Sequence, residues 1–215
     1  LHQKTGPGLH RALTALLLLA PETPMLFMGQ EFGASAPFLF FADFPAGELA
    51  RQIHQGRKQF LAQFPSYASA GAQAAVADPR DPAVFQRSKI DWSERERHAG
   101  SVRLHRDLLR LRREDPVIAQ QARDRLDGAV IGPAAFVLRY AGKQGDDRLL
   151  LINLGADCDY RPAPEPLLAP PDGRTWHLLW SSDAPEYGGP GVIEPLTETG
   201  WVIPGESAAL YSVQG

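Results

Sequence analysis

The first thirty residues contain one apolar helix and one apolar strand, and this pair constrains the fold more than any other feature. Residues 8–20, GLHRALTALLLLA, carry leucines at helical spacing, and Leu18 and Leu19 add a second apolar face. Pro21 is expected to end the helix. The run Met25–Met28 is wholly apolar, which is typical of a strand buried within a parallel sheet. The sequence offers no parallel neighbour for it, so we expect the partners of this α/β unit to lie outside these 215 residues.

Composition and charge exclude several kinds of partner. The 22 Lys and Arg residues against 25 Asp and Glu residues give a net charge of −3, which argues against nucleic acid and against an anionic membrane surface. The run Leu13–Ala20 is far shorter than the roughly 20 apolar residues that span a bilayer. The chain begins with Leu1 rather than Met, and we therefore expect a missing upstream segment.

Cysteine and histidine usage bears on redox compartment and metal binding. The single cysteine, Cys158, excludes an internal disulfide and a cysteine-based metal site, and it is compatible with a reducing cytoplasm. The histidines have no paired ligand spacing, so no metal is expected. They are His2, His10, His54, His98, His105 and His177.

The middle of the chain predicts few elements before one long helix. Gly47–Phe64 indicates one interrupted helix, and Ala77–Trp92 is punctuated by prolines and is expected to be extended. Ser93–Glu114 is the clearest helix, because SERE forms a capping box and leucines recur along one face. Its remaining faces carry arginines that we expect to be solvated: Arg103, Arg106, Arg110, Arg112 and Arg113.

After Asp124 the sequence becomes rich in short β-prone runs. Gly- and Pro-rich turns separate these runs, a pattern that predicts an antiparallel sandwich or barrel. Trp176 and Trp180 lie four apart on one of them and are expected on one face, either in the core or as a sugar-stacking platform. The four runs are residues 134–142, 147–155, 175–183 and 207–215.

The end of the apolar strand is the best candidate for a site. Active sites of parallel α/β barrels lie at the carboxyl ends of the strands, and here that end reads GQEFG and opens into a long aromatic loop. Gly29 permits tight backbone geometry, and Glu31 would lie at a pocket rim. Phe38, Phe40 and Phe41 would offer flat apolar faces to sugar rings. The alternative, in which Glu31 pairs with a loop arginine and the phenylalanines fill a core, stays open from the residues alone.

Residues 23–33, TPMLFMGQEFG, resemble the eighth-strand motif of the α-amylase superfamily of glycoside hydrolases, with Pro24, Gly29 and Glu31 at the matching positions. The stretch 104–118 resembles the eighth helix of that superfamily's barrel, and the terminal strands resemble its C-terminal β domain. The stretches MLFMGQEFGASAPFLFFADF and DPRDPAVFQRSKIDW are similar to a narrower family, the malto-oligosyltrehalose trehalohydrolases. Gln30 departs from that family, which usually has Glu there, so we assign it no catalytic role.

The resemblance implies an α+β fragment: the last α/β units of a TIM (β/α)8 barrel, followed by an antiparallel β-sandwich. Residues 1–123 would supply the seventh helix, eighth strand, long loop and eighth helix, and residues 124–215 the β domain. Retaining glycosidases need two carboxylates about 5–5.5 Å apart. The family takes its catalytic Asp, Glu and Asp from earlier strands, so no catalytic residue is expected in this chain. The loop residues Asp43, Asp78, Asp81 and Asp91 lack the strand framework to replace them.

The implied activity of the whole enzyme is hydrolysis of the α-1,4 bond beside the trehalose end of maltooligosyl trehalose, which releases trehalose. The chain alone is expected to be inactive, to need no cofactor, and to line the maltodextrin cleft with Glu31, Phe38, Phe40 and Phe41. Two alternatives remain: the C-terminal segment of a glycogen-branching enzyme, or a free-standing, non-catalytic glucan-binding module. An independent module would leave the apolar run Leu13–Ala20 exposed, which argues against it.

Overall fold

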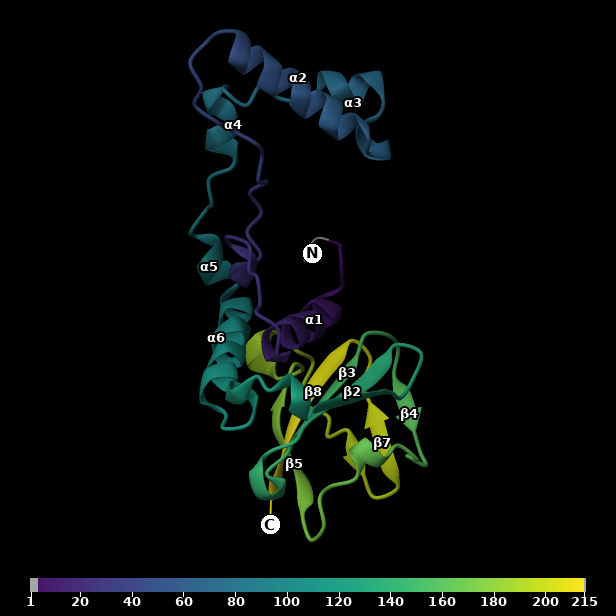
Figure 1. Ribbon diagram of the computed structural model, residues 1–215. Helices are drawn as coiled ribbons and strands as arrows, with labels where there is room; N and C mark the ends of the chain where they lie inside the picture. The colour runs from purple at the N-terminus through teal and green to yellow at the C-terminus, as the bar shows by residue number, and fades with distance from the viewer. Residues whose placement is uncertain (1–3, 215) are drawn as a thin grey trace. The chain divides into compact units, whose positions relative to one another are not determined.

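The computed structural model describes residues 4–214, and the chain divides into two compact units (Figure 1). The first unit comprises the chain up to Gly33 and again from Glu94 onward, and the second comprises Ala34–Ser93. The expected domain boundary between residues 123 and 124 falls within the first unit. Expectations for His2, for the start of the loop before residue 8 and for Gly215 lie outside the described residues.

Helix α1 (Pro7–Leu19) confirms the apolar helix expected near the start of the chain. Pro7 occupies its first turn, and the helix ends two residues before Pro21. The side chain of Glu206 accepts a hydrogen bond from the Leu9 backbone N–H at 3.2 Å, so a distant turn of the β domain caps the first turn of the helix. One apolar face is covered, because Ala12, Ala15, Leu18 and Leu19 are all buried, whereas Leu13, Leu16 and Leu17 are only half-buried.

The predicted strand Met25–Met28 is absent, and this expectation was wrong for the described chain. Residues 23–27 carry no secondary structure, and a turn follows at residue 28. Met25 is 85% exposed and Phe27 is 53% exposed. A strand requires a hydrogen-bonded neighbour, and no described segment pairs with this one. The apolar side chains of this segment therefore have no buried environment among the described residues.

The long helix predicted over Ser93–Glu114 is two helices, α5 (Glu94–Arg97) and α6 (Ala99–Glu114). They are separated at His98, whose φ of −111° and ψ of 36° lie outside the helical region. The serine of the expected capping box donates instead to the carboxylate of Asp91, at 2.7 Å. The capping interpretation was therefore wrong at the helix start, whereas the predicted apolar face of α6 is present and packs against α1.

One of the arginines expected to be solvated is buried. Arg112 on α6 donates hydrogen bonds to the backbone oxygens of Leu18 at 3.0 Å, Ala20, and Glu22 at 2.8 Å. These carbonyls lie at the C-terminal end of α1, where helix carbonyls lack partners of their own. The neighbouring Arg113 is exposed, as expected.

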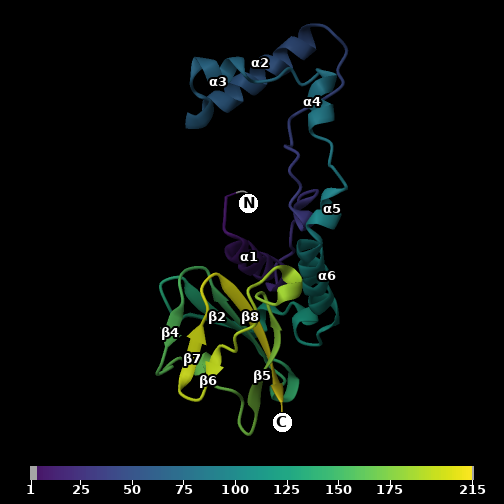
Figure 2. The ribbon, with the colours of Figure 1, turned by 180° about the vertical axis from the view of Figure 1, so that it is seen from behind.

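The C-terminal part is an antiparallel sandwich of two sheets (Figure 2). The larger sheet has the strand order β1-β2-β3-β8-β5, and the smaller has the order β4-β7-β6. The four predicted runs are confirmed as β2, β3, β5 and β8, whereas the other strands were missed because they are short or contain glycine. The strands are β1 (Leu126–Val130), β2 (Ala135–Tyr140), β3 (Arg148–Asn153), β4 (Cys158–Tyr160), β5 (Thr175–Ser181), β6 (Leu196–Thr197), β7 (Gly200–Ile203) and β8 (Ser207–Gln214).

The larger sheet is covered on both faces, so it forms the central layer of the first unit. Every residue of β3 is buried, because alternate side chains enter two different cores. Leu150 and Ile152 belong to a core shared with α1 and α6. Leu149 and Leu151 belong to a core shared with Trp201 and Ile203 of the smaller sheet. Figures 1 and 2 show α1 beside one face of the larger sheet and β7 beside the other.

Trp176 and Trp180 are both core residues, but they do not share a face of the sheet. The pairing of β5 with β8 shifts register between Leu178 and Trp180, which marks a β-bulge. Trp176 therefore enters the core between the two sheets, and Trp180 enters the core beneath the helices. The Trp180 ring nitrogen donates to the hydroxyl of Tyr187 at 3.1 Å. The expectation of a shared face was wrong, and neither ring is a sugar platform at its 7% or 8% exposure.

The second unit contains short helices around two aromatic-rich segments. The interrupted helix predicted over Gly47–Phe64 is the single helix α2 (Glu48–Ala62). The stretch expected to be extended contains α4 (Pro82–Arg87), capped by the Asp81 carboxylate, which accepts from the Ala83 N–H at 2.9 Å. A third helix, α3 (Ala70–Ala74), follows α2. Across residues 4–214 no helix is both long and apolar enough to cross a membrane.

Candidate functional site

The turn that follows the apolar segment holds Glu31 on a defined backbone. Gly29 has φ of 77° and Gly33 has φ of 60°, both in the left-handed region that glycine adopts without strain. Between them Gln30–Phe32 forms one turn of 3-10 helix, η1. The Gln30 side chain accepts a hydrogen bond from the Phe27 N–H at 3.2 Å, which is a local structural role.

Glu31 is half-buried and makes no hydrogen bond or ion pair with the described residues. The arginine partner considered as an alternative for it is therefore not found among them. Its charge instead acts on His105 of α6. Burial lowers the pKa of His105, while the hydrogen bond to the Ser101 backbone and the Glu31 charge oppose that shift.

Two polar atoms on α6 near this turn have no hydrogen-bond partner among the described residues. The Nδ1 atom of His105 contacts the Ser101 backbone oxygen at 2.9 Å, an interaction in which Nδ1 must be the donor. The other ring nitrogen, Nε2, is buried with no hydrogen-bond partner, and so is the Ser101 hydroxyl. Sequence reasoning treated His105 as an ordinary helix histidine, because nothing in the pattern marks these unsatisfied atoms.

The candidate sugar-stacking residues all belong to the second unit. Phe38 is 58% exposed and Phe40 is 42% exposed, while Phe41 is half-buried. The rings of Phe38 and Phe41 meet edge to face with centroids 6.1 Å apart. The Arg57 guanidinium lies over the Phe40 ring at 5.3 Å. Phe38 and Phe40 are therefore partly exposed within this unit, unlike core residues.

Within the second unit the two motifs of the sequence resemblance are joined. The Phe41 ring packs edge to face against Phe85 of α4, with centroids 5.1 Å apart. The Leu39 N–H donates to the hydroxyl of Ser88 at 3.1 Å. The Ala42 N–H donates to the carbonyl of Pro79 at 2.9 Å. The stretch that contains Phe38–Phe41 thus rests on the stretch 77–92 and is not an isolated loop.

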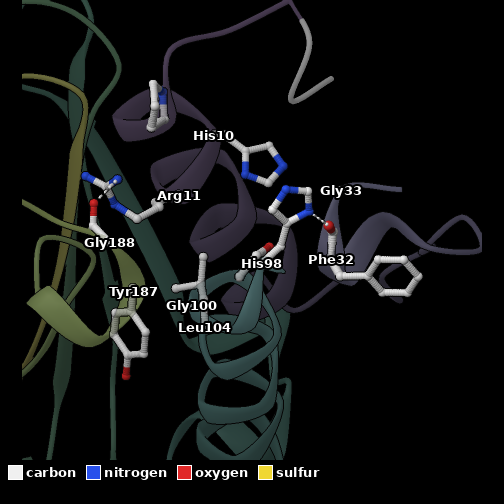
Figure 3. A pocket seen from close by; sticks show the side chains of 11 residues that line it. His10, Arg11, Phe32, Gly33, His98, Gly100, Leu104, Tyr187 and Gly188 are labelled. Atoms are coloured by element: carbon white, nitrogen blue, oxygen red, sulfur yellow. Dashed lines mark hydrogen bonds between the residues drawn. The ribbon is translucent and has the colours of Figure 1, made fainter. Parts of the chain in front are cut away.

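A pocket of about 350 Å³ lies beside the turn that carries Glu31, within the first unit (Figure 3). Figure 3 shows the His10 ring of α1 next to the ring of His98, whose Nδ1 atom bonds to the Phe32 carbonyl at 2.7 Å. Arg11 lies on the opposite wall and is neutralised there by Asp183. The other lining residues are Pro7, Gly33, Gly100, Ser101, Leu104, Tyr187 and Gly188.

Three of the four loop carboxylates weighed as possible catalytic groups, those of Asp78, Asp81 and Asp91, serve local structure. Asp78 accepts from the Arg80 N–H at 3.0 Å, and Asp81 caps α4. Asp91 binds the N–H and hydroxyl of Ser93. The described residues also contain no cluster of three or more His, Cys, Asp or Glu side chains arranged to hold a metal ion.

Comparison with known proteins gives a consistent set of relatives. Residues 123–210 match a family described as a domain of unknown function, DUF3459. Malto-oligosyltrehalose trehalohydrolase from Deinococcus radiodurans is 44% identical over 159 residues, which is 73% of this chain and 25% of that protein. The protein of the same name from Arthrobacter ramosus is 49% identical over 54% of the chain and 20% of its own length.

The chain is a homologue of malto-oligosyltrehalose trehalohydrolases. It spans about a quarter of the length of the D. radiodurans relative. A third trehalohydrolase, from Mycobacterium tuberculosis, is 36% identical over 78% of the chain and 26% of its own length.

Solved structures show the same fold. The catalytic module of the pneumococcal glycogen-degrading factor SpuA superposes with a TM-score of 0.58 at 15% identity, over 97% of this chain and 31% of that one. Trehalose-6-phosphate hydrolase from Bacillus licheniformis gives a TM-score of 0.55 at 13% identity, over 97% and 39%. The chain therefore has the fold of part of an α-amylase-family enzyme, with an antiparallel β-sandwich at its C-terminal end, as the trehalohydrolase resemblance predicted.

Proposed function

We propose that the chain is the closing part of a retaining α-glycosidase that cleaves maltooligosyl trehalose. The whole enzyme would hydrolyse the α-1,4 bond next to the terminal trehalose unit and release trehalose and a shortened maltodextrin. The supporting observation is the 44% identity, over 159 residues, to a protein named malto-oligosyltrehalose trehalohydrolase. A cytoplasmic location is part of the proposal, and the single half-buried cysteine agrees with it.

In this proposal residues 1–123 close the catalytic barrel. Helix α1 is the seventh barrel helix, residues 25–28 become the eighth strand, and α6 is the eighth helix. The exposed apolar side chains of Met25 and Phe27 support this role, since a segment of this kind needs a paired, covered environment. The catalytic Asp, Glu and Asp would come from earlier barrel strands, and this chain would contribute none of them.

The share of this chain in substrate binding would be the rim of the cleft. Glu31 has a carboxylate that bonds to none of the described residues and is suited to accept hydrogen bonds from sugar hydroxyls. Phe38, Phe40 and Phe41 supply exposed or half-exposed ring faces against which a sugar ring can pack. No cofactor or metal enters the proposed reaction.

The activity is tested in a chimaeric enzyme, in which this chain replaces the homologous part of the D. radiodurans relative. We expect the chimaeric enzyme to release trehalose from maltooligosyl trehalose, while the 215-residue chain alone releases none because it lacks the catalytic carboxylates. Trehalose is quantified by chromatography after incubation with the purified protein. A folded chimaera without trehalose release would contradict the proposal.

The same preparation separates the two alternatives. A branching enzyme would shift the iodine absorbance of amylose without releasing trehalose. If the chain were a free-standing glucan-binding module, the isolated chain would bind maltodextrin and the chimaera would have no activity. Neither outcome is expected.

The proposed role of Glu31 is tested by Glu31→Gln in the chimaera. Loss of the charged acceptor is expected to raise KM for maltooligosyl trehalose about fivefold to tenfold, with kcat changed less than about twofold, because a hydrogen bond to a charged group contributes roughly 1.5 kcal/mol. Glu114→Gln, at an exposed position of α6, is the matched control and should leave both parameters unchanged. Unaltered kinetics in Glu31→Gln would make Glu31 an ordinary surface carboxylate.

A further inference from the structure

The chain leaves the first unit and re-enters it at two points that have a hydrogen bond beside them. Gly33 is the last residue before the second unit, and Glu94 is the first residue after it. The hydrogen bond between the His98 ring and the Phe32 carbonyl joins the chain beside these two points, across 66 residues of sequence. Both bonded residues belong to the first unit, so this contact is independent of how the two units are placed.

The Phe32 side of this contact is held in place by local interactions that do not involve His98. Phe32 is completely buried, and the left-handed conformation of Gly29 begins the turn that contains it. The Phe32 N–H donates to Gly29 at 3.3 Å, and the Gly33 N–H donates to Gln30 at 3.1 Å. The Phe32 carbonyl is thereby presented at a constant position, available to a donor from outside the turn.

The His98 side is fixed by the start of α6. The His98 carbonyl accepts from the N–H groups of Ser101 and Val102, at 3.0 and 3.2 Å, and its N–H donates to Glu94 at 2.9 Å. Leu104 and Leu108 hold the same helix in the core, with exposures of 1% and 0%. The break between α5 and α6 therefore has a reason: it turns the imidazole out of the helical path toward Phe32.

The bond needs a proton on Nδ1, because a carbonyl oxygen can only accept. The neutral imidazole with its proton on Nδ1 and the imidazolium both satisfy this requirement. Figure 3 shows the arrangement, with the ring of His10 on α1 beside that of His98.

We infer that His98 is a positioning residue, which clasps the base of residues 34–93 and so holds the aromatic segment Phe38–Phe41 in a binding-competent arrangement. The expected effect of His98 on substrate binding rests on the proposed function. Its expected effect on the base of residues 34–93 rests on the hydrogen bond alone. An unclasped base would let both ends of the segment fray, so the cost would appear in substrate binding and not in the chemical step.

The test compares two replacements of His98. His98→Phe keeps a ring but removes the donor, whereas the amide nitrogen of His98→Asn occupies the position of Nδ1 and restores it. Hydrogen exchange on the 215-residue chain is measured for the amides of Gln30, Phe32 and Gly33. We expect exchange about tenfold faster in His98→Phe and close to the original rate in His98→Asn, because opening of the base exposes these hydrogen bonds.

In the chimaeric enzyme, His98→Phe is expected to raise KM about fivefold with kcat changed less than about twofold, and His98→Asn to recover most of the loss. His177→Phe, at an exposed position of β5, is the matched control and should change neither exchange nor KM. Unchanged exchange in His98→Phe, or an Asn variant as fast as the Phe variant, would overturn the clasp. Faster exchange with an unchanged KM would overturn the positioning role. A chimaera with native His98 that releases no trehalose would count against the proposed function, while the exchange comparison would still decide the clasp.

Discussion

Replacement of Asp115 by alanine is expected to lower the free energy of unfolding by about 3–4 kcal/mol. One carboxylate oxygen of Asp115 accepts from the N–H groups of Val117 and Ile118, at 3.0 and 2.9 Å. The other accepts from the Arg148 side chain at 2.8 Å, and both side chains of this ion pair are less than a tenth exposed. The substitution removes one of the two carboxylates that bind the buried Arg148 guanidinium, and breaking a buried pair from one side costs about 3–5 kcal/mol.

Chemical denaturation followed by tryptophan fluorescence measures this effect, because Trp176, Trp180 and Trp201 are buried reporters. Asp146→Ala is the matched control. It removes the other carboxylate bound by Arg148, but that carboxylate is 44% exposed, so the expected loss is below about 1 kcal/mol. The double variant Asp115→Ala with Arg148→Met should be more stable than Asp115→Ala alone, since it removes the unpaired charge. Equal losses in Asp115→Ala and Asp146→Ala would contradict this account.

Arg112→Ala is expected to cost about 2–3 kcal/mol of unfolding free energy. The guanidinium donates to three backbone carbonyls at the end of α1. Its removal leaves these acceptors without a partner, and an unsatisfied buried acceptor lowers stability by roughly 1–3 kcal/mol. The lost side chain also packs between α1 and α6, which adds to the cost. The same denaturation experiment reports the change as a lower midpoint.

Arg113→Ala, one position along the same helix and exposed, is the control for helix propensity and charge. It should change stability by less than about 0.5 kcal/mol. Arg112→Lys should recover only part of the loss, because a single ammonium cannot present the planar set of donors that reaches Leu18, Ala20 and Glu22 together. Equal stability of Arg112→Ala and Arg113→Ala would show that the helix-capping contacts contribute nothing measurable.

The sequence predicted those elements whose signal is local. The helix over residues 8–20 and the runs that became β2, β3, β5 and β8 combine strong apolar patterning with Gly or Pro boundaries. β1 and β7 were missed, because both are short and each contains a glycine. A β-bulge is not visible in the spacing of Trp176 and Trp180, so their opposite directions could not be predicted.

Features set by distant partners were beyond the reach of sequence patterns. Arg112 looks like any other arginine on a charged helix face, and only the packing of α1 against α6 brings it to the carbonyls it binds. The His98 ring bonds to a carbonyl 66 residues away, a partner that no local pattern reveals. For the candidate site, the position of Glu31 at the end of the apolar segment was predicted, whereas its influence on His105 was not.

The central sheet has a consequence for how this protein can be divided. The family match begins at residue 123, yet one face of the larger sheet is covered by helices that precede it. Excision at that point would bare the side chains of Leu150, Ile152 and Leu210, each worth about 1.5–3 kcal/mol in burial. The segment that matches the family is thus shorter than the segment that buries both faces of this sheet. Any excised version must retain α1 and α6 or replace the apolar residues of that face with polar ones.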